Sequence, residues 1–148
     1  MTGKFIGTYN RALDAKGRVS LPPSFLKALE NDGGPGSFWL TGLYGRLTGY
    51  APERWEEIVE KLCSIKLPSL KLSNFKTKLV GMAQEISPDA QGRIRIPQSL
   101  IREAGLGKDA VLVGILDKFE IWDQARFDAI SVEDVSEELI RFGIDLTL

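Results

Sequence analysis

The sequence has no histidine and only one cysteine, Cys63, among its 148 residues. The absence of histidine excludes a Ser–His–Asp triad, a Cys–His pair and a His-ligated zinc site. A single cysteine cannot close an intramolecular disulfide, and its place on the apolar side of a helical pattern predicts a core position. Because no P-loop, dinucleotide fingerprint or metal-ligand cluster is present, we expect no catalytic residue, no metal and no cofactor.

Long apolar runs are also missing, and the mean hydropathy of −0.07 argues against a membrane-spanning helix. Residues 1–11 lack the apolar stretch of a secretory signal peptide. Apolar residues make up 43% of the chain and charged residues 26%, as in a globular domain with a real core. These features predict a soluble cytoplasmic protein.

Strong net charge is absent as well, since the chain carries −1, which argues against a generic polyanion binder. The charge is nevertheless unevenly distributed. Residues 1–80 hold 12 basic and 7 acidic side chains, whereas residues 81–148 hold 7 basic and 13 acidic ones. This asymmetry fits a basic functional face with an acidic tail, and it equally fits two solvated surfaces of opposite sign.

The chain contains an internal repeat, which decides its architecture. Asp14-Ala-Lys-Gly-Arg-Val-Ser-Leu-Pro22 and Asp89-Ala-Gln-Gly-Arg-Ile-Arg-Ile-Pro97 share five identical positions at an offset of 75 residues. After a length change in the glycine-rich segment 32–36, the match resumes at an offset of 72. There Leu40-Thr-Gly-Leu43 aligns with Leu112-Val-Gly-Ile115. Two matching runs in the same order indicate a tandem duplication.

Both copies predict the same elements: a strand, a tight turn, a short alternating strand, a helix, a strand hairpin and a closing helix. In the first copy we expect them at 5–9, 18–21, 23–30, 38–41 with 47–50, and 52–66. In the second copy we expect the same elements at 84–86, 93–96, 98–104 and 111–115 with 118–122. Its closing helix is expected to begin after an N-cap at Asp123, with Phe127 and Ile130 pointing inward.

Two further helices are predicted outside the repeated elements. Between the copies, Lys71, Lys76 and Lys78 alternate with apolar residues, which indicates a helix with a basic face or a merely solubilised connector. Near the end, Val135, Leu139 and Phe142 are spaced as in an amphipathic helix that docks on its own chain or on a neighbour.

The repeated Asp-Ala-x-Gly-Arg segment has the chemistry of a tight turn. Its aspartate can accept hydrogen bonds from backbone N–H groups further along, and its glycine supplies the positive φ of a type I turn with a bulge. The arginine then begins a strand whose side chains alternate between faces, so it points outward. The turn-defining residues are Asp14, Gly17, Asp89 and Gly92, and the outward arginines are Arg18, Arg93 and Arg95.

The duplication therefore presents a guanidinium group twice, on two equivalent hairpins. Arginine contacts phosphates and pairs with guanine in the major groove, which a two-stranded ribbon fits. A second interpretation is that Asp14–Arg18 and Asp89–Arg93 are only ion pairs that stabilise their turns. The pattern by itself leaves both interpretations open.

These duplicated segments resemble the paired Asp-x-x-x-Arg signature of the bacterial MraZ regulators. The similarity extends through Ala104-Gly-Leu-Gly107, Val111–Trp122 and the helix from Pro52, up to about Ile130. It implies a mainly β fold with short helices (α+β), namely a tandem-duplicated AbrB/SpoVT-like swapped-hairpin (double-split) β-barrel. The chain departs from the family in its lysine-based linker, where the family is arginine-rich, and in its acidic end.

The resemblance implies a sequence-specific DNA-binding transcription regulator of the division and cell-wall gene cluster, autoregulatory and associated with the nucleoid. It implies a ring-shaped homo-oligomer on repeated promoter boxes of double-stranded DNA, with no membrane and no small-molecule substrate. The DNA contacts that carry over are Arg18 and Arg93, with Lys16 and Arg95 flanking them, and the signature aspartates are Asp14 and Asp89.

The expected division of the chain is a first AbrB-like repeat with its closing helix (1–66), a helical basic linker (67–83), a second repeat (84–130) and an acidic amphipathic tail (131–148). A structural or protein-interaction ring without DNA contact is the alternative function, and the acidic second half favours it. An enzyme has no motif in its support.

Overall fold

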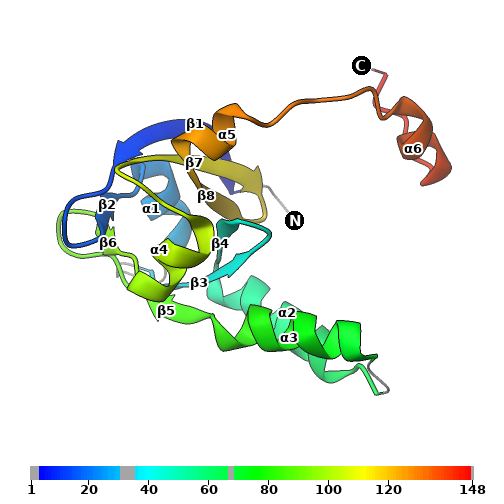
Figure 1. Cartoon of the computed structure of the whole chain (residues 1–148), viewed down its shortest axis with the longest axis horizontal. Helices are drawn as coiled ribbons and strands as arrows, with labels where there is room; N and C mark the ends of the chain where they lie inside the picture. Colours follow the sequence, from blue (N-terminus) through cyan, green and yellow to red (C-terminus); the bar gives the residue numbers. More distant parts are fainter. Residues whose placement is uncertain (1–3, 31–35, 67–68, 148) are drawn as a thin grey trace.

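The computed structural model describes residues 4–30, 36–66 and 69–147 (Figure 1). The first copy contains β1 (Phe5–Ala12), β2 (Arg18–Ser20), α1 (Pro23–Leu29), β3 (Phe38–Leu43), β4 (Arg46–Tyr50) and α2 (Pro52–Cys63). The second part contains α3 (Leu70–Gly81), β5 (Gln84–Ile86), β6 (Arg93–Arg95), α4 (Gln98–Ala104), β7 (Asp109–Leu116), β8 (Phe119–Asp123), α5 (Gln124–Asp128) and α6 (Ser136–Arg141). The predicted order of elements is confirmed. The described residues do not include most of the length change at 32–36, residues 67 and 68 of the linker, or residue 148 of the tail.

Six strands form one antiparallel sheet in the order β1-β7-β8-β4-β3-β5. The leading strand of each copy is exchanged: β1 pairs with β7 of the second copy, and β5 pairs with β3 of the first. The two hairpins meet where β4 pairs with β8. The order reads the same from both ends when the copies are interchanged, so each copy completes the sheet of the other.

The structure confirms the mixed α+β class and the duplication, but the predicted swapped-hairpin barrel is not closed. Within the described residues, the six-stranded sheet has two edges, β1 and β5, which do not pair with each other. The strands β2 and β6 form a separate two-stranded antiparallel sheet. Closure requires every strand to have two partners, and β5 is only three residues long.

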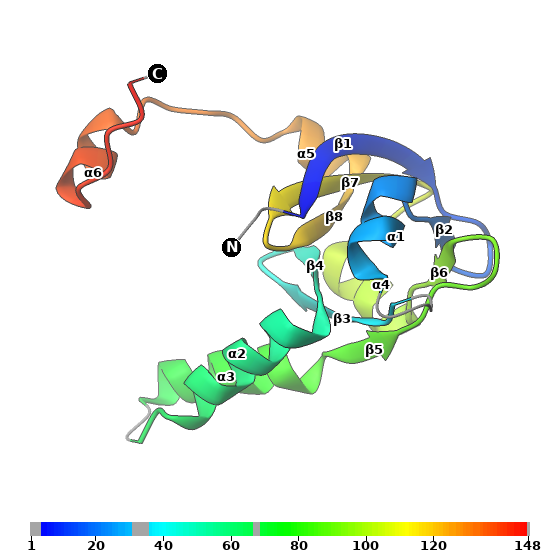
Figure 2. The same cartoon turned by 180° about the vertical axis from the view of Figure 1, so that it is seen from behind.

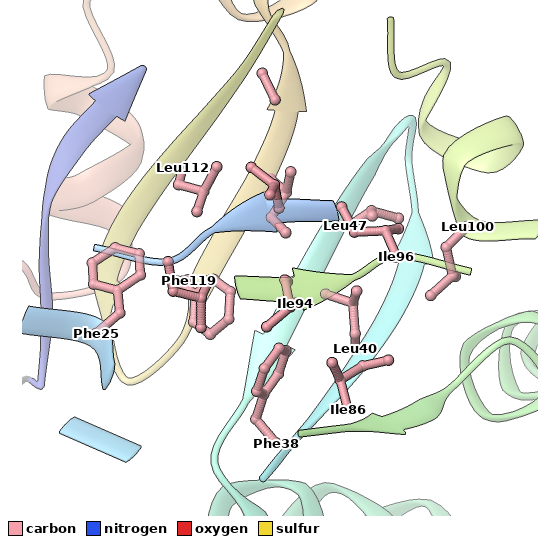
Figure 3. Packing of buried hydrophobic residues seen from close by; sticks show 14 of the residues in the cluster. Phe25, Phe38, Leu40, Leu47, Ile86, Ile94, Ile96, Leu100, Leu112 and Phe119 are labelled. Atoms are coloured by element: carbon pink, nitrogen blue, oxygen red, sulfur yellow. The ribbon is translucent and has the colours of Figure 1, made fainter. Parts of the chain in front are cut away.

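The core lies between the large sheet, the β2–β6 pair and the helices α1 and α4 (Figure 3). Val19 and Ile94, which face each other on β2 and β6, are both buried, as the alternation of strand side chains predicts. Phe5, Phe25 and Phe119 pack with ring centroids 5.2 to 5.4 Å apart. A Cβ atom at Gly49 would lie 2.3 Å from the ring of Phe119, so this glycine makes room for the aromatic side chain.

A second apolar cluster joins α2 to α3 through Trp55, Leu62 and Leu79. Trp55 stacks on Trp39 of β3 with ring centroids 5.7 Å apart, which fixes α2 against the sheet. The predicted core position of Cys63 is wrong, because its side chain is exposed. Cys63 is the last residue of α2 and is rotated about 100° from Leu62, away from the buried stripe.

The C-terminal part leaves the body after α5. Asp123 caps α5 by accepting a hydrogen bond from the Ala125 N–H, as predicted, and the half-buried Phe127 packs edge-on against Trp122. Ile130, expected to point inward, is exposed. Beyond it an extended segment leads to α6, which lies apart from the rest of the chain in both views (Figures 1 and 2). None of the described helices has the length and apolar character needed to span a bilayer.

Candidate nucleic-acid interface

The first turn is built around the carboxylate of Asp14. Its Oδ1 accepts hydrogen bonds from the backbone N–H groups of Lys16 at 2.9 Å and Arg18 at 2.8 Å. The Gly17 N–H bonds to the Asp14 carbonyl at 3.0 Å, and Gly17 adopts a φ of 78°. The predicted turn chemistry is therefore present, and it starts β2 at Arg18.

The second turn repeats this geometry. Asp89 Oδ1 accepts from the backbone N–H groups of Gln91 and Arg93, each at 2.9 Å, and Gly92 has the same φ of 78°. These backbone bonds, first that from Arg93, hold the pKa of Asp89 below its ordinary value. The bond from the Arg18 N–H does the same for the pKa of Asp14. Both carboxylates therefore stay charged at a lower pH than an ordinary aspartate does.

Each aspartate also orients the arginine at the end of its turn. Arg18 Nε donates to Asp14 Oδ2 at 2.7 Å, and Arg93 Nε donates to Asp89 Oδ2 at 3.0 Å. The ion pairs Asp14–Arg18 and Asp89–Arg93, which the turn-stabilising interpretation predicts, are therefore present. Among the residues that the structure describes, however, neither guanidinium uses its terminal amino groups in a hydrogen bond. The side chains remain 35% and 34% exposed, so the pairing positions each arginine without sequestering it.

Each turn accepts a backbone hydrogen bond from the opposite copy. The Gly17 carbonyl accepts a hydrogen bond from Ile96 N–H at 2.8 Å, and the Gly92 carbonyl accepts one from Leu21 N–H at 3.0 Å. A Cβ atom at Gly92 would lie 2.7 Å from Leu26 of α1. These contacts set the two turns at opposite ends of one short ribbon.

The register of β2 and β6 brings the predicted side chains together on one face. Arg18 lies directly opposite Arg95, and Arg93 lies opposite Ser20. Residues two apart on a strand share a face, so all four point away from the buried Val19. Arg18 and Arg93 are diagonal neighbours, a relation that places side chains about 7 to 8 Å apart. We call this surface the arginine face and define it by Arg18, Arg93 and Arg95 of the ribbon, together with Lys16 of the turn that leads to Arg18.

The two ends of the arginine face differ in charge. Lys16 and Arg95 are both exposed, and both belong to the end that holds Arg18. Their counterparts at the same offset of 75 are Gln91 and Ser20, which are neutral. Sequence reasoning named the cations but missed this clustering, because the pairing of strands from different copies brings them together.

The lysines of α3 do not belong to this face. The loops around β2 and β6 lie at one end of the body, whereas α2 and α3 extend from the other in both views (Figures 1 and 2). Lys78 instead pairs with Glu103 of α4 at 3.0 Å. The structure therefore separates the predicted turn contacts from the predicted basic linker.

Comparison with known proteins gives a consistent result over nearly the whole chain. A family model described as "MraZ protein, putative antitoxin-like" matches residues 4–72 and 79–141. A protein named Transcriptional regulator MraZ from Maridesulfovibrio salexigens is 42% identical over 146 residues, which cover 97% of this chain and 98% of the relative. The protein of the same name from Nitratidesulfovibrio vulgaris, strain Hildenborough, is 44% identical over 144 residues, covering 95% and 97%. That from Ligilactobacillus salivarius is 36% identical over 147 residues, covering 95% and 99%.

Proposed function

This chain belongs to the MraZ family, and we propose that it is a transcription regulator that binds double-stranded promoter DNA through its arginine face. The observation that carries the proposal is the alignment of Arg18, Arg93 and Arg95 on one ribbon, where the terminal amino groups of Arg18 and Arg93 make no hydrogen bond to the described residues. Relatives named as transcriptional regulators support it.

In this proposal the terminal amino groups of Arg18 and Arg93 contact bases and phosphates, while Lys16 and Arg95 contact flanking phosphates. A bidentate arginine pairs with guanine O6 and N7, and each such pair discriminates against a wrong base by about 1 to 3 kcal/mol. Asp14 and Asp89 hold the Nε atoms, so little side-chain freedom is lost on binding. The turns therefore act as positioning devices for the arginines.

We further propose that several chains act together as a ring on repeated promoter boxes, in the cytoplasm and associated with the nucleoid. One chain carries a net charge of −1 and offers few cations, so a single arginine face neutralises few phosphates. Linking several faces raises the effective concentration of each after the first has bound. Control of the division and cell-wall gene cluster, including its own gene, is the biological role we propose for this binding.

The test is fluorescence anisotropy with the double-stranded DNA upstream of the gene, at two salt concentrations. We expect tight, salt-sensitive binding by the wild-type chain and loss of at least a hundredfold in affinity for Arg18→Ala/Arg93→Ala. Lys27→Ala/Arg102→Ala is the matched control, because it removes one exposed cation from the equivalent position of each copy. Retained binding by the first variant would overturn the role of the two arginines.

A structural or protein-interaction ring without DNA contact is the second candidate, and the exposed acidic tail favours it. It predicts that no upstream DNA shifts the anisotropy at any salt concentration, while the chain still recovers a protein partner in a pull-down. The two candidates are thus separated by the same binding experiment on the wild-type protein.

A further inference from the structure

The C-terminal tail, residues 129–147, is folded, but it does not pack against any other element in the described part of the chain. Every residue from 129 to 147 except Leu139 is exposed. The exposed apolar side chains are Ile130, Val132, Val135, Ile140, Phe142, Ile144 and Leu146. A helix as short as α6, with six residues, is marginal in water without packing. The tail therefore lacks the contact that would stabilise it.

Local contacts nevertheless define its shape. Asp134 Oδ1 accepts from the Ser136 N–H at 3.0 Å at the start of α6. At its end Gly143 has a φ of 74°, its N–H bonds to the Ile140 carbonyl, and the Ile144 N–H bonds back to the Leu139 carbonyl, each at 2.9 Å. This is a Schellman cap, which brings the side chains of Leu139 and Ile144 together. The tail thus presents a defined apolar surface.

The helix α3 offers a surface that matches it. One side of α3 packs on α2 through Phe75 and Leu79, and Lys78 reaches Glu103 of α4. The remaining side stays open: Leu72 and Val80 are 45% and 42% exposed, and the exposed Lys76 lies between them at a spacing of four residues. Leu70 and Lys71 are exposed as well, at the start of the helix, but they lie on other sides of it than this row.

The two surfaces carry opposite charge. The helix α3 contains three lysines and no acidic residue, and Lys78 pairs with Glu103, which leaves Lys71 and Lys76; residues 129–148 contain five carboxylates and one arginine. Nucleic acid would match the lysines but would leave the exposed Leu70, Leu72 and Val80 in water. An acidic, apolar protein segment satisfies both properties of α3.

We propose that the tail of one copy docks on the open side of α3 in a second copy of this chain. In both views α6 and the α2–α3 hairpin project separately from the body, so each is placed to reach a neighbour (Figures 1 and 2). Such a contact joins different surfaces of identical chains and generates a ring when the rotation closes. The inference deepens the ring of the proposed function by naming its contact, and it does not depend on the arginine face.

Cysteine cross-linking between co-expressed full-length chains tests the contact. Both chains carry Cys63→Ser; one also carries Phe142→Cys, and the other carries one receiving cysteine. We expect a disulfide-linked pair of chains with Leu72→Cys and none with Lys27→Cys, an exposed control position on α1. Ile6→Cys probes another exposed apolar pair of the body, Ile6 and Ile115, which face each other on β1 and β7. Cross-linking that favours Ile6→Cys, or equals the control, overturns the proposal.

Charge reversal provides a second, independent readout through the molar mass in solution by light scattering. We expect Lys76→Glu to lower the molar mass of the assembly, and Glu138→Lys in the same chain to restore it. An unchanged molar mass with weaker DNA binding would assign α3 to nucleic acid instead and overturn the docking. If the Phe142→Cys and Leu72→Cys chains cross-link while the wild-type chain binds no upstream DNA, the docking is established and the proposed function alone is rejected.

Discussion

Arg18 of the first copy and Arg95 of the second are direct cross-strand partners in the β2–β6 ribbon. Asp14 pairs with Arg18, and no carboxylate in the described residues pairs with Arg95. Like charges directly opposite each other destabilise a sheet. The ribbon therefore keeps an arrangement that is unfavourable for the free protein and favourable for an anionic ligand.

Arg95→Ser, which introduces the residue found at the equivalent position, Ser20, should separate the effect on stability from the effect on ligand binding. We expect the free protein to gain on the order of 0.2 to 1 kcal/mol in free energy of unfolding, because the repulsion with Arg18 is removed. Affinity for upstream DNA should fall in the same variant. Urea unfolding and anisotropy measure the two quantities, and a loss of stability would contradict the proposed repulsion.

Lys16→Gln and Gln91→Lys test the unequal ends of the arginine face. For each phosphate that a variant no longer neutralises, the slope of log affinity against log salt becomes shallower by about 0.9 per bound chain. We expect this change for Lys16→Gln, and no comparable change for Gln91→Ala at the opposite end. Gln91→Lys should steepen the slope. Equal effects of Lys16→Gln and Gln91→Ala would show that the charge difference has no role in binding.

The turn aspartates predict a specific dependence of stability on pH. Backbone hydrogen bonds lower the pKa of Asp14 and of Asp89 in the folded chain. Their contribution is therefore fully present above the unfolded pKa of about 3.9 and is lost as the pH falls through the folded values. We expect Tm, followed by circular dichroism, to fall below about pH 4 in the wild type and to fall less in Asp14→Asn/Asp89→Asn. Identical pH profiles would contradict this assignment.

Gly49→Ala tests the contact between β4 and Phe119. Its Cβ atom would lie 2.3 to 2.7 Å from the ring, and overpacking of this kind costs about 1 to 3 kcal/mol. Gly81→Ala is the matched control, because its Cβ position in α3 has no described heavy atom within 4 Å apart from its chain neighbours and its own helix backbone. There we expect no loss and a gain of at most about 0.5 to 1 kcal/mol, the value for a helix interior, because Gly81 is the last residue of α3. Thermal unfolding of both variants gives the comparison, and equal Tm values would show that the ring moves aside freely.

Local physics explains what could be predicted at the candidate site. The aspartate, the glycine and the arginine of each turn are within five residues of one another, so their hydrogen bonds follow from short-range geometry. The alternation of strand side chains likewise placed Val19 inside and Arg18 outside. The predicted core position of Cys63 was wrong because helical periodicity defines neither where a helix ends nor which side of its last turn packs against another element.

The sequence by itself determined the duplication, the order of elements and the two turns, because each depends on residues close together in the chain. Only the tertiary structure decided that β1 joins β7, that β5 joins β3 and that Arg18 faces Arg95. Those pairings join segments about 45 to 110 residues apart through backbone hydrogen bonds, which are chemically the same at every residue except proline. Their register is therefore set by how the core of both copies packs, and no local pattern encodes it.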